Sequence, residues 1–407
     1  MNKLKRKKIY FIGNFGNGNI GNECTLQAIL HHCRKYLPDA EITGVCANPD
    51  DVSGRHHIHA IPISDRHRKR RPNRDSITVK IVQKILLEIP EEILRWIKAF
   101  HSLKGVNMLV MTGTGMITDD DGGSWGLPYE LMKWTFIAKM RHSRVFYVSV
   151  GAEPIHHWMT RWFFKLALFL ADYRSFRDVK SKEYLHDIGI DVNQDPVYPD
   201  LAYSLPLTEM QYRVSDNRAR DVIGVGLLDY AGQGRRVREG NEHGQYIGQI
   251  VNIITWLIEN KYIVRILIGD MNYDNRVKQE IKALIAQRGI PYESAQIIDE
   301  PICTVSNLLA QLSQTEMIIA SRFHNVLLSL MLNIPAISLS YSTKNDALMN
   351  EYGLRQYCQR IDRLDINLLK EQFIDLRNAA ADLIPTLKEK TEEFRRELTT
   401  QYDHIFK

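Results

Sequence analysis

Cysteine is scarce in this chain, and the cysteines that are present show neither a disulfide nor a zinc-ligand pattern. There are five in 407 residues, an odd number with no Cys-x-x-Cys spacing, which argues against a disulfide framework. No group of histidines, cysteines and carboxylates has the spacing of a metal site. We therefore expect a reducing compartment, the cytoplasm, and neither a metal nor a bound cofactor.

Long hydrophobic runs are also absent. No apolar stretch approaches the roughly 20 residues of a transmembrane helix, and the basic N-terminus is followed only by Ile9–Ile12, which is too short for a signal-peptide core. The most apolar segment begins at Trp158, but Arg161, Lys165 and Asp172 interrupt it, so we expect it to pack in a core. Peripheral contact with the inner face of a membrane is the alternative.

Charge is close to balanced. A net charge of +5, with 25% charged and 44% hydrophobic residues, is ordinary for a globular protein, and the length predicts two or three domains. The densest basic run, Arg66–Arg74, could attract nucleic acid, an anionic membrane or a phosphorylated acceptor. Because no aromatic residues are interleaved for base stacking, we expect a solvated loop and no nucleic-acid partner.

Short apolar runs alternate with helical patterns along the whole chain. One series of runs lies at residues 9–12, 42–45, 108–111, 145–150 and 173–176, and a second at 222–227, 263–268, 297–298, 317–320 and 336–339. Such alternation is typical of βαβ units with parallel strands. A polar stretch at 208–220 separates the two series. We therefore predict an α/β protein with a domain boundary near residue 208 and a charged, helical region after Leu364.

A strand, two basic residues and a helix follow one another at residues 317–332. The run Met-Ile-Ile-Ala ends directly before Ser-Arg-Phe-His, so Arg322 and His324 lie at the carboxyl end of a strand, where open α/β sheets bind ligands. The next helix, predicted over 325–332, offers unpaired backbone N–H groups to an anion. Lys344, in the loop after the following strand, adds a cation at the same edge. This grouping predicts a site for a small phosphorylated anion.

Glycine-rich loops follow three strands of the first series. The loop at 13–23 contains neither a dinucleotide fingerprint nor a Walker lysine, so its glycines either cradle a ligand phosphate or serve the turn alone. Four amides in this loop can orient sugar hydroxyls: Asn14, Asn17, Asn19 and Asn22. Further loops lie at 112–119 and 150–154, and Arg174 and Arg177 bracket the end of the strand at 173–176. One of these arginines could supply a guanidinium clamp.

In the order of these motifs the chain resembles the polysaccharide pyruvyl transferase family, from the N-terminal loop to about Leu354. The most specific match is Ser-Arg-Phe-His at 321–324, then an apolar helix, Ile-Pro-Ala-Ile, Tyr341 and Lys344. Weaker matches are Gly-Asn-Phe-Gly at 13–16 with Gly-Asn-Glu at 21–23, the turn at 113–115, Ser-Val-Gly-Ala-Glu-Pro at 149–154, Phe-Arg-Asp at 176–178 and Pro-Asp-Leu-Ala-Tyr at 199–203. The chain departs from the family by lacking three consecutive glycines at 112–115 and by having Gly21-Asn22 where Gly-Asp is common; both departures concern the acceptor.

The resemblance implies two Rossmann-like domains facing a cleft, similar to the B-type glycosyltransferases: residues 1–207 on the acceptor side, 208–360 on the phosphoenolpyruvate side, and a helical tail, 361–407. The donor would be phosphoenolpyruvate, and the product a pyruvate ketal on a sugar or lipid-linked saccharide for cell-surface polysaccharide. His324 would move the proton, with Arg322 sharing the catalytic role. The donor would contact Arg177, Arg322, Phe323 and Lys344, and the acceptor would contact Asn14, Asn17, Asn22, Glu23 and Thr114.

Two other functions stay open at this point. A B-type glycosyltransferase would bind a nucleotide sugar at the same edge of the C-terminal domain, and fold alone does not separate the two. A nucleotide sugar would call for a base-stacking pocket and a ribose-binding carboxylate, whereas phosphoenolpyruvate needs only a compact cluster of cations. A non-catalytic carbohydrate-binding relative is the third possibility, and it would have no need of Arg322 and His324 together.

Overall fold

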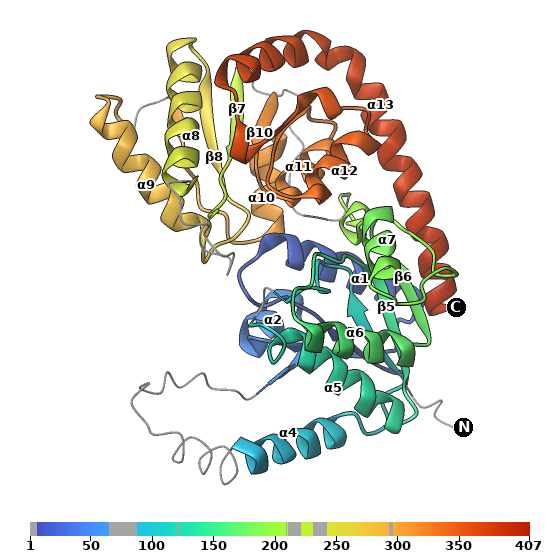
Figure 1. The fold of residues 1–407 in the computed structure, drawn as a ribbon. Coiled ribbons are helices and arrows are strands. Elements are labelled where there is room, and N and C mark those ends of the chain that lie inside the picture. The colour runs from blue at the N-terminus through green and yellow to red at the C-terminus, as the bar shows by residue number, and fades with distance from the viewer. Residues whose placement is uncertain are drawn as a thin grey trace, which may run out of the picture. The chain divides into compact units, whose positions relative to one another are not determined.

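The chain forms two compact units (Figure 1). Our computed structural model describes residues 6–64, 88–119, 122–208, 210, 221–230, 242–292 and 296–407. Unit 1 comprises Met1–Asn17 and Cys33–Val197, and unit 2 comprises Gly18–His32 and Tyr198–Lys407. The basic run at 66–74 and nearly all of the polar stretch at 208–220 lie outside the described residues.

Unit 1 is built on a parallel six-stranded sheet in the order β3-β2-β1-β4-β5-β6. Its strands are β1 (Lys8–Ile12), β2 (Glu41–Cys46), β3 (His59–Pro62), β4 (Met108–Thr112), β5 (Arg144–Val150) and β6 (Tyr173–Phe176). The order reverses between β1 and β4, so the loops after these two strands flank the switch point where parallel sheets bind ligands.

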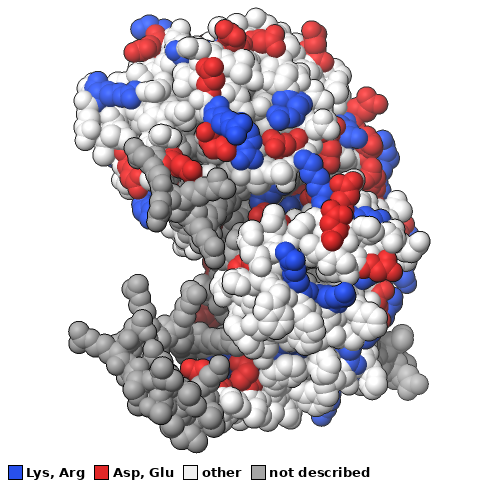
Figure 2. Space-filling model, in the orientation of Figure 1, with Lys and Arg blue, Asp and Glu red and all other residues white. Residues whose placement is uncertain are grey.

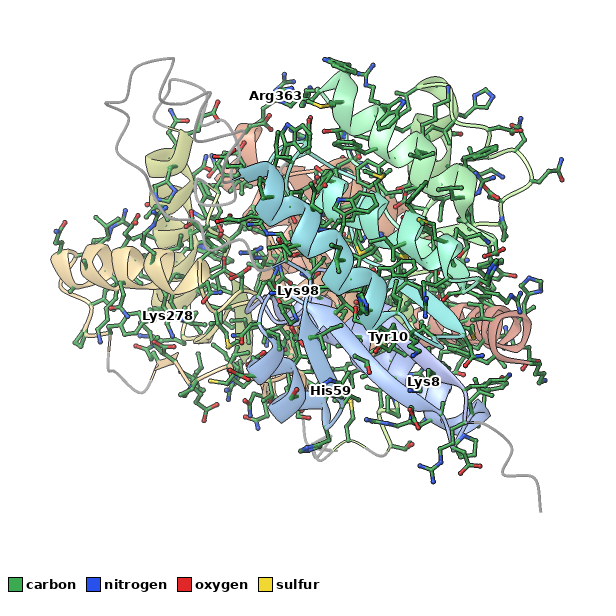
Figure 3. All side chains as sticks on the ribbon, turned by 90° about the horizontal axis from the view of Figure 1, so that it is seen from below. Lys8, Tyr10, His59, Lys98, Lys278 and Arg363 are labelled. Carbon is green, nitrogen blue, oxygen red and sulfur yellow. The ribbon has the colours of Figure 1, made fainter. Side chains whose placement is uncertain are left out.

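Helices cover both faces of this sheet. They are α1 (Ile20–Tyr36), which passes from unit 2 residues into unit 1, and α2 (Pro49–His56), α4 (Ile89–Ser102), α5 (Leu127–Met140), α6 (Trp158–Leu170) and α7 (Val179–Asp187). Tyr10 on β1 ties the sheet to α4, because its hydroxyl donates a hydrogen bond of 3.0 Å to the carbonyl oxygen of Ser102 (Figure 3).

The apolar segment at Trp158 packs in the core on one side only. Helix α6 buries Phe163, Phe164 and neighbouring small residues against the sheet, whereas Trp158 and Phe169 are largely exposed. The sequence prediction of core packing is therefore right for the inner face of α6 and wrong for its outer face.

Unit 2 has a second parallel six-stranded sheet, in the order β12-β11-β10-β7-β8-β9. Its strands are β7 (Val222–Gly226), β8 (Ile263–Leu267), β9 (Ile297–Ile298), β10 (Met317–Ala320), β11 (Ala336–Ser340) and β12 (Cys358–Arg360). Its helices include α8 (Glu242–Glu259), α9 (Asp274–Gln287), α10 (Val305–Ser313), α11 (Phe323–Met331) and α12 (Thr343–Glu351). Here the order reverses between β7 and β10.

The C-terminal region forms one long helix, α13 (Ile366–Phe406), which packs within unit 2. Asp365 begins it by accepting hydrogen bonds from the backbone N–H groups of Asn367 and Leu368. Near its end, the hydroxyl groups of Tyr402 and Ser204 are 2.8 Å apart. The charged pattern after Leu364 is thus helical, as predicted.

The predicted fold class is confirmed. All ten strands expected from the sequence are present, with each end at or within one residue of its expected position; β3 and β12 were not predicted. Within the described residues, none of the helices combines the length and the apolarity that crossing a bilayer requires.

Candidate functional site

The carboxyl edge of the unit 2 sheet gathers the basic residues singled out in the sequence. Strand β10 ends at Ala320, Arg322 directly precedes α11, and Phe323 and His324 lie in its first turn. The helix thus begins two residues earlier than predicted. Lys344 lies in the first turn of α12 rather than in a loop. Because β10 and β11 are neighbours, both helix starts lie at the same edge of the sheet.

Arg322 is buried and paired with a carboxylate that the sequence reading missed. Its Nε donates to Asp274 Oδ2 over 2.9 Å, and one terminal nitrogen donates to Asp274 Oδ1; both residues are nearly inaccessible to solvent. Burial lowers the pKa of the Arg322 guanidinium, but the Asp274 charge outweighs it, so the pKa is raised overall. Asp274 occupies the side of the guanidinium, and a ligand carboxylate or phosphate would meet the end formed by the two Nη atoms.

Asp274 also fixes the ends of two strands. Its carboxylate accepts hydrogen bonds from the backbone N–H groups of Gly269 and Asp270, at 3.0 and 2.9 Å, and of Asp229, at 2.9 Å. The loops after β7 and β8 are therefore joined to Arg322 after β10 through one side chain. This carboxylate organises the switch point of the unit 2 sheet.

His324 lies between a glycine and an aspartate. Its Nε2 is 3.7 Å from Oδ2 of the buried Asp200 and has no hydrogen-bond partner among the described residues. The other side of the ring lies against Gly21, where an added Cβ would be 2.0 Å from Nδ1. This arrangement holds the imidazole in one orientation with an ionic partner beside it.

Packing therefore requires a glycine at position 21, because a side chain there would meet the His324 ring. Neither explanation offered for the N-terminal glycines, a phosphate cradle or the turn alone, includes this contact. We expect Gly21→Ala to displace the His324 ring with the fold retained. If His324 moves a proton in catalysis, as the resemblance implies, turnover should fall by about 100-fold, the scale of a lost general acid or base. Gly248→Ala on α8 is the matched control, because no atom lies within 4 Å of its added Cβ. Steady-state kinetics of both variants would check this, and equal turnover of the two would contradict it.

Glu23 and Asp200 are two buried carboxylates of unit 2. Glu23 is in the first turn of α1, and Cys24 follows it. Burial, then the charge of Asp200, then that of Glu23 raise the pKa of the Cys24 thiol, so Cys24 stays protonated and unreactive. Glu23, a predicted acceptor residue, is thus fully buried, while the side chain of Asn22 beside it is partly accessible to solvent.

Lys344 and Phe323 are the remaining predicted donor residues of unit 2. Lys344 is partly accessible, with its ammonium 5.2 Å from the centre of the Tyr341 ring. The Phe323 ring lies edge-on to His324 with 5.1 Å between centroids. Asn325 is fully buried at the switch point, and neither atom of its amide has a hydrogen-bond partner among the described residues. Such an amide marks a place where a polar ligand group would be stabilised.

In unit 1, Arg177 lies at the carboxyl end of β6. Its side chain is buried, its Nε is 3.5 Å from Asp178, and an added Cβ on Gly151 would lie 2.5 Å from one of its terminal nitrogens. Asp178 also starts α7 by accepting a hydrogen bond from the backbone N–H of Ser181. Arg174 pairs with Asp195 at 3.0 Å. Of the two arginines that bracket this strand, Arg177 is therefore the one placed beside the glycine loop.

The predicted acceptor residues are divided between the two units. Asn14, Asn17 and Thr114 belong to unit 1, and Asn22 and Glu23 to unit 2. Asn17 donates to Asn14 over 3.1 Å, and the buried Thr114 hydroxyl has no hydrogen-bond partner among the described residues. The structure thus places these side chains at the carboxyl edges of both sheets. In the part of the chain that the structure describes, no three His, Cys, Asp or Glu side chains converge as metal ligands.

A family model described as polysaccharide pyruvyl transferase matches residues 19–343, most of the chain. The chain belongs to the polysaccharide pyruvyl transferase family. The matched region contains Asp200, Arg322 and His324 and reaches the start of α12. Membership identifies a pyruvyl transferase of polysaccharide biosynthesis and implies a sugar or polysaccharide acceptor. Among curated proteins no relative matches the chain.

Solved structures with the same fold lie at low sequence identity to this family member. A UDP-GlcNAc 2-epimerase from Methanocaldococcus jannaschii has a TM-score of 0.58 at 13% identity, with 90% of this chain and 92% of that one covered. The Neisseria meningitidis UDP-GlcNAc 2-epimerase bound to UDP-GlcNAc scores 0.56 at 12% identity, covering 97% and 100%. A Polygonum tinctorium UDP-glucosyltransferase scores 0.52 at 12% identity, covering 98% and 99%. These likenesses establish the B-type glycosyltransferase fold and nothing about substrate.

Proposed function

We propose that this pyruvyl transferase moves the pyruvyl group of phosphoenolpyruvate onto two hydroxyls of a sugar, forming a pyruvate ketal. The observation that carries the proposal is the grouping of Arg322, His324 and Lys344 at one sheet edge beside the buried Asp200. Two anionic groups of the donor suit compact cations, and a guanidinium can bind either one through two hydrogen bonds.

His324 supplies the proton chemistry. Protonation of the methylene carbon by the imidazolium leaves an oxocarbenium-like centre, which the first sugar hydroxyl attacks. Phosphate then leaves as its C–O bond breaks, and the second hydroxyl closes the ketal. One hydroxyl proton ends on the new methyl group and the other on the released phosphate. Asp200, 3.7 Å from the imidazole, stabilises the charged ring before the transfer, and Lys344 neutralises the leaving phosphate.

The test is turnover with isotopically labelled phosphoenolpyruvate and a panel of sugar acceptors, including lipid-linked saccharides and nucleotide sugars. The proposal expects phosphate release coupled to an acceptor whose mass has increased by one pyruvate less one water. Transfer of a sugar from a nucleotide sugar, with phosphoenolpyruvate unused, would instead support a glycosyltransferase. Binding without any turnover would support a non-catalytic carbohydrate-binding protein.

Arg177 is proposed as a further donor ligand. We expect Arg177→Lys to weaken phosphoenolpyruvate binding at least tenfold, because an ammonium cannot make the paired hydrogen bonds of a guanidinium. Gly151→Ala should act in the same direction, since its Cβ would displace the Arg177 terminal nitrogen. Arg174→Lys is the matched control, because Arg174 pairs with Asp195. Calorimetric titration checks this, and equal affinity in Arg177→Lys and Arg174→Lys would remove Arg177 from the site.

A further inference from the structure

The outer surface of the helix layer α4–α5–α6 in unit 1 is unusually apolar. Figures 1 and 3 show these helices side by side, and Trp96 on α4 contacts Phe136 on α5. Their inner sides join the unit 1 core. Large apolar side chains nevertheless remain exposed on all three helices: Ile89, Ile93, Leu94 and Ile97 on α4, Phe136 and Met140 on α5, and Trp158, Trp162 and Phe169 on α6.

Helix α6 combines exposed aromatic rings with cations. Trp158, Trp162 and Phe169 are 75%, 54% and 80% exposed, and they extend over about 16 Å of the helix at 1.5 Å per residue. Arg161 and Lys165 lie among them and are also exposed. Tryptophan and phenylalanine with interspersed lysine and arginine are typical of helices that lie in the interfacial region of a bilayer.

The charges of this face are complementary to an anionic surface. Helix α6 contains no aspartate or glutamate, and its Lys165 is exposed. Two acids beside the ends of α6 are engaged locally: Asp172 pairs with Lys139 at 2.7 Å, and Asp119 accepts hydrogen bonds from the backbone N–H groups of His156 and His157 at 2.8 and 2.9 Å. In Figure 2 the surface over α5 and α6 is largely white, with both basic and acidic side chains around it.

We propose that the exposed side of α6, formed by Trp158, Arg161, Trp162, Lys165 and Phe169 and here called the α6 face, docks unit 1 on an anionic lipid surface. The aromatic rings would enter the headgroup region, and Arg161 and Lys165 would contact lipid phosphates. A second copy of the chain fits the face less well. A two-fold contact through α6 would bring these cations against their own copies, and the helix has no acid to compensate them. The inference is independent of the donor and of turnover.

Vesicle sedimentation of the full chain tests the proposal. We expect the parent to bind vesicles containing phosphatidylglycerol, to bind phosphatidylcholine vesicles far less, and to dissociate as salt is raised. The double variant Trp158→Ser/Phe169→Ser should lose at least tenfold in binding. Arg161→Gln/Lys165→Gln should lose about fivefold for each removed cation. The basic run at 66–74 stays unchanged in every variant, so its contribution is constant.

Ile374→Ser on α13, a side chain that is also half exposed, is the matched control and should bind as the parent does. All substituted positions are exposed, so circular dichroism should show the parental fold and melting midpoint. The proposal is overturned if the parent does not bind anionic vesicles at low salt, or if binding survives both double variants. It is equally overturned if sedimentation velocity shows a dimer that Trp158→Ser/Phe169→Ser converts to a monomer, because a second copy would then cover the face.

Discussion

Replacing His324 with alanine should lower turnover by about 10²- to 10⁴-fold, the range for loss of a positioned general acid or base. The imidazole is the one group at this sheet edge with both an ionic partner, Asp200 at 3.7 Å, and a ring nitrogen without a hydrogen bond in the described structure. Binding of phosphoenolpyruvate should fall much less, because in the proposed site the arginines would bind the donor's charged groups. Single-turnover kinetics and calorimetry separate the two effects.

The control for this loss is His404→Ala, an exposed histidine in the last turn of α13, which should leave turnover unchanged. Asp200→Asn should fall between the two, since it keeps the size of the side chain but removes the charge beside the imidazole. Turnover of His324→Ala within threefold of the parent would exclude His324 from proton transfer.

The second large effect is on stability. Asp274→Asn should destabilise unit 2 by about 3–5 kcal/mol, the usual result of removing one partner of a buried ion pair. The amide cannot neutralise Arg322, and its NH₂ group would face backbone N–H groups that Asp274 now accepts from. At roughly 2–4 °C per kcal/mol, the melting midpoint should fall by about 6–20 °C, and phosphoenolpyruvate binding should be lost with the orientation of Arg322.

Asp270→Asn is the matched control for Asp274→Asn, because both carboxylates are buried at the same loop. Burial, the largest cause, and the neighbouring Asp274 charge raise the pKa of Asp270, which Arg322 partly opposes. A carboxyl whose folded pKa is raised destabilises the fold once pH rises through that pKa. The asparagine removes this penalty and still accepts from the N–H groups of Asn272 and Tyr273. At neutral pH its melting midpoint should equal or exceed the parent's; a loss matching that of Asp274→Asn would contradict this account.

The strands were predictable because each is a short apolar run between helical patterns, and buried parallel strands have that composition. The two missed strands, β3 and β12, are His-Ala-Ile-Pro and Cys-Gln-Arg, sequences of only four and three residues without an apolar run. Both are at an edge of their sheet, where one side of the strand is unpaired and burial imposes a weaker pattern.

The basic half of the candidate site was predictable, whereas its acidic half was not. Arg322 and His324 follow a strand directly, so local order reveals their position. Asp274 and Asp200 lie far from these residues in the sequence. Only the folded sheet brings Asp274, at the start of α9, to Arg322, and Asp200 to His324. The role of Gly21 was not predictable either. A Cβ at this position would meet His324, which is distant in the sequence, and no local turn signal encodes that contact.

The most direct test of the central claim is calorimetric titration of phosphoenolpyruvate, and of a panel of nucleotide sugars, into the parent and into Arg322→Lys. The lysine keeps a charge for Asp274 but lacks the planar pair of donors. The account predicts saturable phosphoenolpyruvate binding by the parent and at least a tenfold loss in Arg322→Lys. A parent that ignores phosphoenolpyruvate, binds a nucleotide sugar and transfers its sugar to an acceptor would contradict it.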